Sequence, residues 1–410
     1  MTSDKKATSL VSLGACLEYY DFIIFALMAE TFGHLFFPAD QPIAASIKAL
    51  GVFALGYLAR PLGGVFLGAL GDRFGRKYVF INVMMVMAIS TFAIGLLPTY
   101  ATIGNAAPFL LVLCRIIQGI SFGAEVPGAM TIVAEFAKPS KQGVFAGFVV
   151  SSLALGSLLA SSLLYILTSL MSQEAFLHFA WRIPFILGGI LAVFSYVLRK
   201  ELQETPIFLK EKGEVKAKRS YLTKADIPKV IIGIGMTFAI ASLVVFFLYL
   251  PAFLSVYYKY PLKSVYFAMT IAIVWSMIIS PITGLFADRV NKRILYILTS
   301  FVVTFALFPL FASLFHVNLT FLVFTLCLYQ TFISLLSVCY FPLIASIFQP
   351  LARYTGIAAS YGIGYCLMGL LPMAATWLIS LTGTPMSGVL LLAFFTVVGA
   401  VSGYLIPLAK

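Results

Sequence analysis

GALGDRFGRK, residues 68–77, places one acid, three bases and three glycines between two long apolar runs. A related segment, GLFADRVNKR, occupies residues 284–293, which is 216 residues further along the chain. Each copy follows the second apolar run of its half of the chain and precedes the third. A repeat with this spacing predicts two structurally equivalent halves, related as parallel repeats.

The composition is that of a membrane protein. Of the 410 residues, 61% are hydrophobic and 10% are charged, and the mean hydropathy is +1.03; soluble domains have roughly a quarter of their residues charged. Apolar runs of about twenty residues recur, the length that a helix needs to cross the hydrocarbon core, and backbone in lipid must be helical. We therefore predict an all-α polytopic membrane protein with twelve transmembrane helices in two pseudo-symmetric six-helix bundles. The predicted spans are 8–36, 44–71, 77–98, 107–136, 142–170, 181–199, 228–257, 263–287, 294–315, 318–348, 352–381 and 385–407.

One long hydrophilic segment divides these spans six to six. We interpret residues 200–227 as a cytoplasmic linker between the N-terminal six-helix bundle, residues 1–199, and the C-terminal six-helix bundle, residues 228–410. With this assignment, 21 of the 27 Lys and Arg residues fall on one side of the membrane. By the positive-inside rule, both termini face the cytoplasm. The net charge of +12 is therefore explained by the orientation of the chain in the membrane, and we expect no nucleic-acid partner. The five cysteines are scattered through the spans, which predicts neither a disulfide framework nor a metal site.

The segment 68–77 fits the G-x3-D-R-x-G-R-K signature of the major facilitator superfamily, and the second copy departs from it at Asn291. Within that superfamily the chain resembles the metabolite:H+ symporters, a group that includes proline/betaine, α-ketoglutarate and citrate transporters. The motifs that carry the resemblance are GACLEYYDF (14–22), ARPLGG (59–64), RIIQGISFGAE (115–125), WRIPF (181–185) and ELQETPIF (201–208). The resemblance implies the fold of that superfamily, transport by alternating access and a functional monomer.

Charged residues inside the membrane are costly and need a reason. Those that fall well inside the predicted spans all belong to the first half: Glu18, Asp21, Arg60, Arg115 and Glu125. No acidic residue follows Asp288. We therefore expect any proton chemistry of carboxylates in the N-terminal half.

The first and fourth spans hold most of these groups. Glu18 and Asp21 are three residues apart and share a helix face. The fourth span carries a polar stripe at helical spacing: Arg115, Gln118, Phe122 and Glu125. The resemblance implies that these two helices line the same cavity. We expect Asp21 or Glu18 to pair with Arg115, and Glu125 or the unpaired first-span acid to exchange the proton. Ion pairs that only fix helix packing are the alternative.

Substrate contacts are expected from both halves. The N-terminal candidates are Tyr19, Arg60, Arg115, Gln118 and Phe122, and the C-terminal candidates are Tyr249, Trp275, Tyr329, Gln330 and Tyr361. An aromatic wall that carries hydroxyl groups can hold an ammonium group by cation–π contact or donate hydrogen bonds to a carboxylate. Packing against lipid or neighbouring helices is the alternative for each aromatic residue. The two arginines favour a substrate with a carboxylate, either an organic acid or a zwitterion.

The predicted function is secondary active import of such a metabolite with protons, across the inner (plasma) membrane. No nucleotide-binding G-x4-G-K-[ST] loop occurs, and we expect no cofactor, no metal and no enzymatic activity. The expected partners are the small-molecule substrate, protons and the lipid bilayer. A proton-independent facilitator or exchanger is the alternative, and a membrane receptor or channel is a more distant one.

The segment 68–77 itself lies outside the hydrocarbon, between spans two and three, and we interpret it as a gate. Asp72 is expected to meet a helix N-terminus of the other half or a nearby basic residue, and Glu135 is expected to pair with Arg73 or Arg76. A loop that only anchors the topology is the alternative. The candidate gating residues are Gly68, Asp72, Arg73, Gly75, Arg76, Lys77 and Glu135, with Asp288 and Arg289 in the second copy.

Overall fold

The computed structural model describes residues 3–37, 42–205, 209 and 222–406, and within these ranges the chain is helical with no strand. The α-helices are α1 Ser3–Leu27, α2 Ala29–Phe36, α3 Pro42–Phe74, α4 Arg76–Leu96, α5 Tyr100–Ile103, α6 Ala106–Phe136, α7 Gln142–Leu170, α8 Gln173–His178, α9 Ile183–Arg199, α11 Ile227–Tyr257, α12 Leu262–Ala287, α13 Lys292–Ser313, α14 Leu319–Ile347, α15 Arg353–Met368, α16 Leu371–Thr382 and α17 Met386–Tyr404. Short 3₁₀ turns precede some of them: η1 Pro139–Lys141, η2 Ala180–Arg182, η3 Lys224–Asp226 and η4 Pro350–Ala352.

Twelve segments of the described chain are long and apolar enough to cross a membrane, so the predicted number of spans is confirmed. Two predicted spans are not continuous helices. The first is interrupted at Met28, between α1 and α2. The eleventh is interrupted between α15 and α16, where Gly369 caps α15 and Pro372 occupies the first turn of α16. Proline lacks a backbone N–H, and the first turn of a helix is the position that tolerates this loss.

The predicted linker is described only at its two ends. Residues 206–208 and 210–221 lie outside the described residues. At the far end, Thr223 and Asp226 form a reciprocal capping box at η3, just before α11 begins. At the near end, the chain after α9 continues to Thr205, whose hydroxyl donates to Glu135 of α6.

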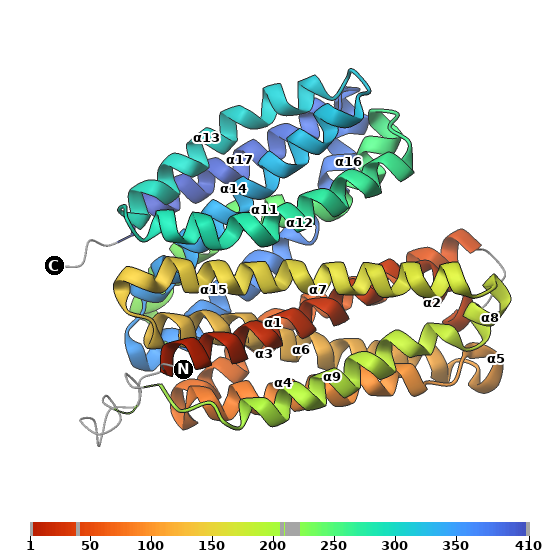
Figure 1. Ribbon diagram of the computed structural model, residues 1–410, viewed down its shortest axis with the longest axis horizontal. Coiled ribbons are helices and arrows are strands. Elements are labelled where there is room, and N and C mark those ends of the chain that lie inside the picture. The colour runs from red at the N-terminus through yellow and green to blue at the C-terminus, as the bar shows by residue number, and fades with distance from the viewer. Residues whose placement is uncertain (1–2, 38–41, 206–208, 210–221, 407–410) are drawn as a thin grey trace.

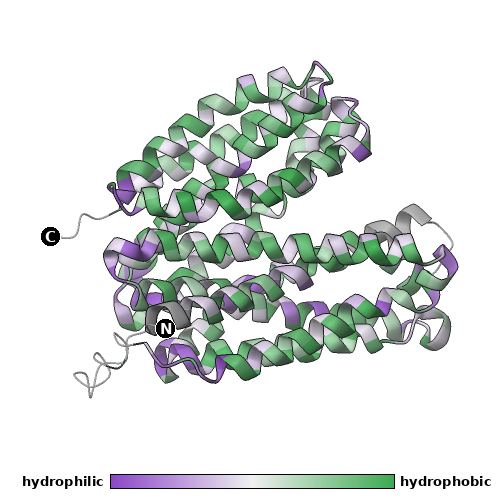
Figure 2. Cartoon of the chain, in the orientation of Figure 1, coloured by the Kyte–Doolittle hydropathy of each residue, from purple (hydrophilic) through white to green (hydrophobic). Residues whose placement is uncertain are grey.

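The helices form two groups that lie side by side (Figure 1). One group contains α1, α3, α4, α6, α7 and α9, and the other contains α11, α12, α13, α14 and α17. Between the groups, α7 packs against α12, and α15 packs against α3 as well as α11. Hydrophilic residues gather at the helix ends, whereas the long middle sections are mostly hydrophobic (Figure 2). Helix ends outside the hydrocarbon can keep their charges hydrated.

Glycines bring α3 and α6 into backbone contact. A Cβ atom at Gly119 would overlap the carbonyl oxygen of Gly56, and one at Gly123 would overlap that of Arg60. A larger residue at either glycine would push the helices apart. This approach places Arg60 of α3 and Arg115 of α6 in the same buried region of the first group.

Candidate functional site

A cavity of about 1880 Å³ lies between the two helix groups. Its wall reaches Leu262, the first residue of α12, so the cavity extends toward the end of the molecule opposite Asp288. Among the described residues that line it, none is Asp, Glu, Lys or Arg. The tyrosines of the wall are Tyr19, Tyr57, Tyr165, Tyr249, Tyr266, Tyr340, Tyr361 and Tyr365, and Gln330 lines it as well. The cavity therefore offers rings and neutral hydrogen-bonding groups to a solute.

Aromatic residues separate the first arginine from the cavity. The Arg60 guanidinium lies 3.9 Å from the ring centroid of Tyr57 and 3.8 Å from that of Phe122. On the cavity side, the rings of Tyr361 and Tyr365 are 4.4 Å apart. Arg60 is 3% exposed and does not line the cavity, whereas Tyr57 does.

The second arginine belongs to a polar chain on α1, α4 and α6. The Arg115 guanidinium donates to the side-chain oxygen of Gln118 at 2.7 Å, and the Gln118 amide donates to Asp21 at 2.8 Å and to Thr91 at 2.9 Å. Gln118 thus bridges Arg115 and Asp21, one of the two first-span acids expected to pair with Arg115. The Arg115 guanidinium also lies 3.9 Å from the centroid of the Phe25 ring. The fourth-span stripe supplies the bridge because Arg115 and Gln118 are one turn apart.

Four of the five N-terminal substrate candidates do not line the large cavity. Arg60, Arg115, Gln118 and Phe122 surround a separate void of about 10 Å³. Of the predicted substrate contacts, those that the structure places on the cavity wall are Tyr19, Tyr249, Gln330 and Tyr361. In this arrangement, the polar chain is therefore shielded from a solute by the cavity wall.

Two of the C-terminal candidates, Tyr329 and Trp275, do not line the cavity in this arrangement. The Tyr329 hydroxyl donates to the carbonyl of Leu243 at 2.8 Å, and its side chain is buried between helices. Trp275 is 39% exposed and donates to the Thr331 hydroxyl at 2.9 Å. Helical spacing alone could not show which face of α12 and α14 borders the cavity.

A second buried charge group lies nearer the opposite end of the first helix group. Arg199, the last residue of α9, forms an ion pair with Glu125 of α6 at 2.5 Å. Its guanidinium also donates to the Phe80 carbonyl at 3.3 Å. Glu18 of α1 is fully buried, and neither of its carboxyl oxygens has a hydrogen-bond partner in the described part of the chain. Glu18, Glu125 and Arg199 belong to α1, α6 and α9, and the sequence does not show that these three helices meet at this point.

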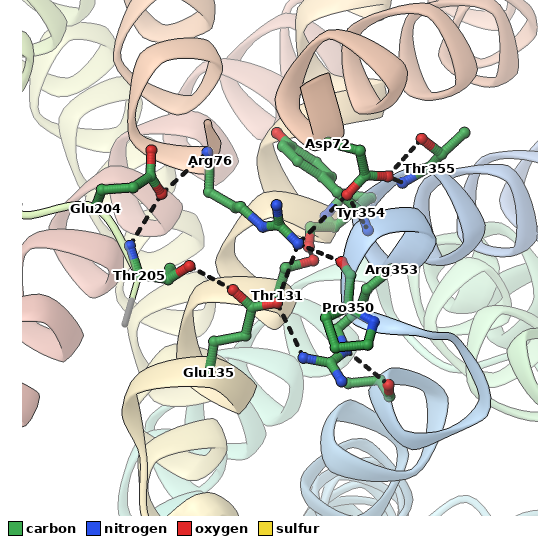
Figure 3. Close-up of polar contacts among 12 residues, drawn as sticks. Asp72, Arg76, Thr131, Glu135, Glu204, Thr205, Pro350, Arg353, Tyr354 and Thr355 are labelled. Carbon is green, nitrogen blue, oxygen red and sulfur yellow. Dashed lines mark hydrogen bonds and ion pairs between the residues drawn. The ribbon is translucent and has the colours of Figure 1, made fainter. Parts of the chain in front are cut away.

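The segment 68–77 forms one interdomain contact (Figure 3). The Asp72 carboxylate accepts from the backbone N–H groups of Tyr354 at 3.3 Å and Thr355 at 2.9 Å, and from the Thr355 hydroxyl at 2.7 Å. These donors belong to the first turn of α15, where unpaired N–H groups and the helix dipole favour an anion. Gly68 permits the approach, because a Cβ there would lie 2.9 Å from Thr355 Cα. We call this contact the first latch.

A cluster of charges supports the first latch. Glu135 of α6 forms ion pairs with Arg76 at 3.2 Å and with Arg353 of α15 at 2.9 Å. Arg76 also lies 3.5 Å from Asp72 and donates to the Pro350 carbonyl. Glu135 therefore joins Arg76, at the start of α4 in the first helix group, to Arg353 of α15, which belongs to the C-terminal half of the chain.

The chain after α9 adds two contacts to the same cluster. The Glu204 carboxylate accepts from the backbone N–H groups of Arg76 at 3.1 Å and Lys77 at 3.3 Å, and so caps α4. The Thr205 hydroxyl donates to Glu135 at 2.5 Å. Gly75, with φ of 119°, makes the turn between α3 and α4 that exposes these N–H groups. Only glycine adopts such a conformation readily.

The second copy of the repeat makes an equivalent contact in the opposite direction. The Asp288 carboxylate accepts from the backbone N–H groups of Gly143 at 2.8 Å and Val144 at 2.9 Å, in the first turn of α7. Lys292 pairs with Asp288 at 2.9 Å. Asn291 has an extended backbone, and its side chain caps α13 instead of making a glycine-like turn. We call this contact the second latch.

The remaining basic residues of the two copies lie on the surface. Arg73 is exposed, with its guanidinium 5.0 Å from the Phe74 ring centroid, and Arg289 is exposed as well. The buried partner of Glu135 in the first copy is Arg76.

Several residues that contact these sites are not among the predicted site residues. In the sequence, Arg199 is one positive charge at the end of a predicted span, and Glu204 and Thr205 belong to the motif ELQETPIF. Arg353 and Tyr354 begin α15, within the segment FQPLARYTG (348–356), whose sequence resembles FAKPSKQG at 136–143. That resemblance marks the first turns of α15 and α7, which are the two helix starts that the latches cap.

A chain of twelve membrane-spanning segments in two groups, with a cavity between the groups and polar contacts that close one end, has the architecture of a secondary transporter. The chain belongs to the major facilitator superfamily, because residues 10–371 match the sequence profile described as Major Facilitator Superfamily. It is therefore a multi-pass membrane transporter, and not an enzyme.

Curated relatives and a solved structure agree with this assignment. The chain is 31% identical to the proline/betaine transporter of Salmonella typhimurium, over 97% of this chain and 82% of that protein. It is 33% identical to the inner membrane metabolite transport protein YhjE of Escherichia coli, over 89% and 86% of the two chains. The structure of the proton:xylose symporter XylE matches with a TM-score of 0.79 at 17% identity, over 99% of this chain and 96% of that chain. This last likeness concerns the fold.

Proposed function

We propose that this protein imports a small zwitterionic metabolite with a carboxylate group, of the proline or betaine type, together with protons. The observation that carries the proposal is the 1880 Å³ cavity, whose described wall is rich in tyrosine and holds no charged residue. A net anion would enter this cavity without a cation to compensate the loss of hydration. A zwitterion can place its ammonium group against tyrosine rings and its carboxylate against hydroxyl groups and Gln330.

The positive-inside distribution supports an orientation in which both latches and both termini face the cytoplasm of the cell. The cavity then extends toward the outside while the latches close the cytoplasmic end. Residues 1–199 and 228–410 would act as two six-helix units that rock about the site, with residues 200–227 as the linker. We further propose that the transporter resides in the inner membrane, works as a monomer and needs neither cofactor nor nucleic acid.

The buried acids of the first half support proton coupling. Glu18, Asp21 and Glu125 are each 3% exposed or less, and the second half has no acid after Asp288. A buried carboxyl group whose surroundings change between two access states can bind a proton in one state and release it in the other. Facilitated diffusion or exchange would need no such group.

Uptake by proteoliposomes tests the proposal. Purified protein is reconstituted, and uptake of radiolabelled proline, glycine betaine and citrate is followed with and without an inward proton gradient, at clamped membrane potential. We expect gradient-dependent accumulation of a zwitterion and little uptake of citrate. Accumulation of citrate alone would refute the substrate class. Uptake that never exceeds the outside concentration, whatever the gradient, would refute the coupling.

A further inference from the structure

The group formed by Glu18, Glu125 and Arg199 lies between the cavity and the first latch. Glu18, Glu125 and Arg199 are at most 1% exposed. On the cavity side, Tyr19 and Tyr361 are close enough to Glu18 to interact with it electrostatically, and both line the cavity. Tyr19 and Tyr361 therefore connect this charge group to the cavity, from which a proton would enter.

Gly14 allows Arg199 to reach this position. A Cβ atom at Gly14 would overlap the Arg199 guanidinium, so the guanidinium lies against α1. Glu18 is four residues beyond Gly14 and lies on the same face of α1, one turn away. Arg199 is thus next to the Glu18 side of α1, although its ion pair in this state is with Glu125.

Two carboxyl groups lie near one guanidinium in this group, and one of them pairs with it. Glu125 holds Arg199 at 2.5 Å, while both oxygens of Glu18 and the second oxygen of Glu125 have no hydrogen-bond partner in the described part of the chain. The other charged groups that act on Glu18 are Arg60 and Asp21. Asp21 is engaged with Gln118, and Arg60 is stacked between aromatic rings. A buried carboxylate without a partner is costly, and a bound proton removes that cost.

Tyr354 joins the group to the first latch. Its backbone N–H donates to Asp72 at 3.3 Å, and its hydroxyl donates to the carbonyl of Ala124, the residue before Glu125, at 2.8 Å. Its fully buried side chain interacts electrostatically with Glu125, Glu18 and Arg199. Tyr354 belongs to α15, so separation of α15 from α3 would carry its ring away from the charge group.

We propose that Glu18, Glu125 and Arg199 form a proton-release device controlled by the first latch, with Tyr354 as its plug. While Asp72 holds α15, Glu18 carries the proton on its carboxyl oxygen. When α15 leaves and Tyr354 withdraws, water enters and hydrates the Glu125 carboxylate, and Arg199 turns from Glu125 toward Glu18. The O–H bond of Glu18 breaks, the proton passes to cytoplasmic water, and the resulting carboxylate pairs with Arg199. Arg199 is a positioning residue, because it acts through Glu18. The direction of release rests on the proposed orientation and coupling.

Infrared spectroscopy of the purified protein in lipid tests this device without any substrate. At neutral pH we expect the carbonyl band of a protonated buried carboxyl group in the wild type. The band should disappear in Glu18→Gln and remain in Asp21→Asn. Glu174→Gln removes an exposed acid of α8 and is the matched control, which should keep the band. A band that is absent from the wild type, or that persists in Glu18→Gln, overturns the proposal.

The link to the latch is tested by opening it. Asp72→Asn weakens the hold on α15, and the band should weaken because Glu18 ionises in the opened state. The double variant Asp72→Asn/Arg199→Gln should keep the Glu18 band, because no cation then turns to Glu18, and Arg199→Lys should restore the weakening. Because Arg199→Gln also leaves Glu125 without its ion pair, the comparison is made in a Glu125→Gln background, where Glu125 contributes no band. These variants also test the proton-release device if Glu18→Gln does not fold. A band of equal strength in Asp72→Asn and in its Arg199→Gln double variant would overturn the role of Arg199.

Transport separates this inference from the proposed function. For one proton per substrate, one pH unit supports about tenfold accumulation. Glu18→Gln should lower accumulation of the transported zwitterion to the outside level while counterflow of labelled for unlabelled substrate continues. Wild-type uptake that ignores the gradient would refute the coupling, whatever the infrared result. Gradient-driven accumulation that persists in Glu18→Gln would refute the device alone.

Discussion

Neutralising Asp72 should release the first latch, and the size of the effect follows from its contacts. Its carboxylate accepts two backbone N–H groups of α15 at 3.3 and 2.9 Å in a buried setting. A hydrogen bond to a charged group is worth about 1 kcal/mol more than a neutral one. Asp72→Asn therefore costs the latched state about 2 kcal/mol, similar to the largest charge–dipole effects at helix ends. This corresponds to a roughly 30-fold larger open population.

A buried cysteine reports that population. Thr131 of α6 is fully buried beside the latch (Figure 3), and cysteine is close to threonine in size. In a background without the five native cysteines, Thr131→Cys is labelled by an impermeant maleimide in inside-out vesicles. While the open state is rare, the labelling rate is proportional to its population. We expect Asp72→Asn to raise the rate about 30-fold.

The control is another capping aspartate. Asp226 caps η3 through Thr223 within one helix group, at a position that no latch uses. Asp226→Asn should leave the labelling rate of Thr131→Cys unchanged. Equal rates in the wild type, Asp72→Asn and Asp226→Asn would show that Asp72 does not hold the closed state. A rise in both variants would indicate general loosening of the fold.

Three further predictions follow from single contacts. Glu204→Gln weakens the cap on α4 by about 1 kcal/mol and should raise the labelling rate of the same cysteine about fivefold; an unchanged rate would exclude the linker from the gate. Gly119→Ala should lower the melting temperature, because a Cβ there overlaps α3, whereas Gly51→Ala meets nothing within 4 Å and should not; equal melting temperatures in a thermal-shift assay would contradict the close helix approach. Tyr361→Leu removes a cavity ring worth about 1–2 kcal/mol to an ammonium group, so the KM for a zwitterion should rise roughly tenfold. Trp275→Leu should leave that KM unchanged, and the opposite result would restore Trp275 as a substrate contact.

The sequence by itself determined the number of spans and the relation between the halves. Hydropathy is sufficient for the spans, because a helix in lipid must satisfy its own backbone and cover about 30 Å of hydrocarbon. The repeat at 68–77 and 284–293 can be recognised in the sequence because both copies have the same structural role. Each presents a carboxylate to the start of a helix in the other half. Most span ends were predicted within a few residues, but the first apolar span ends at Leu27 and the second begins at Ala54. The interruptions at Met28 and Gly369 were not predicted, since apolar residues continue on both sides of each.

The tertiary structure alone decided which charges meet. Glu18 and Asp21 share a face of α1, yet Asp21 accepts from Gln118 while Glu18 has no partner in the described chain. Helical spacing gives the direction of a side chain on its own helix and carries no information about the helix opposite. Arg199 shows the same limit. Its position at the end of an apolar run predicts a cation at the membrane interface. The packing of α9 against α1, where Gly14 leaves room for the guanidinium, places it instead beside Glu125.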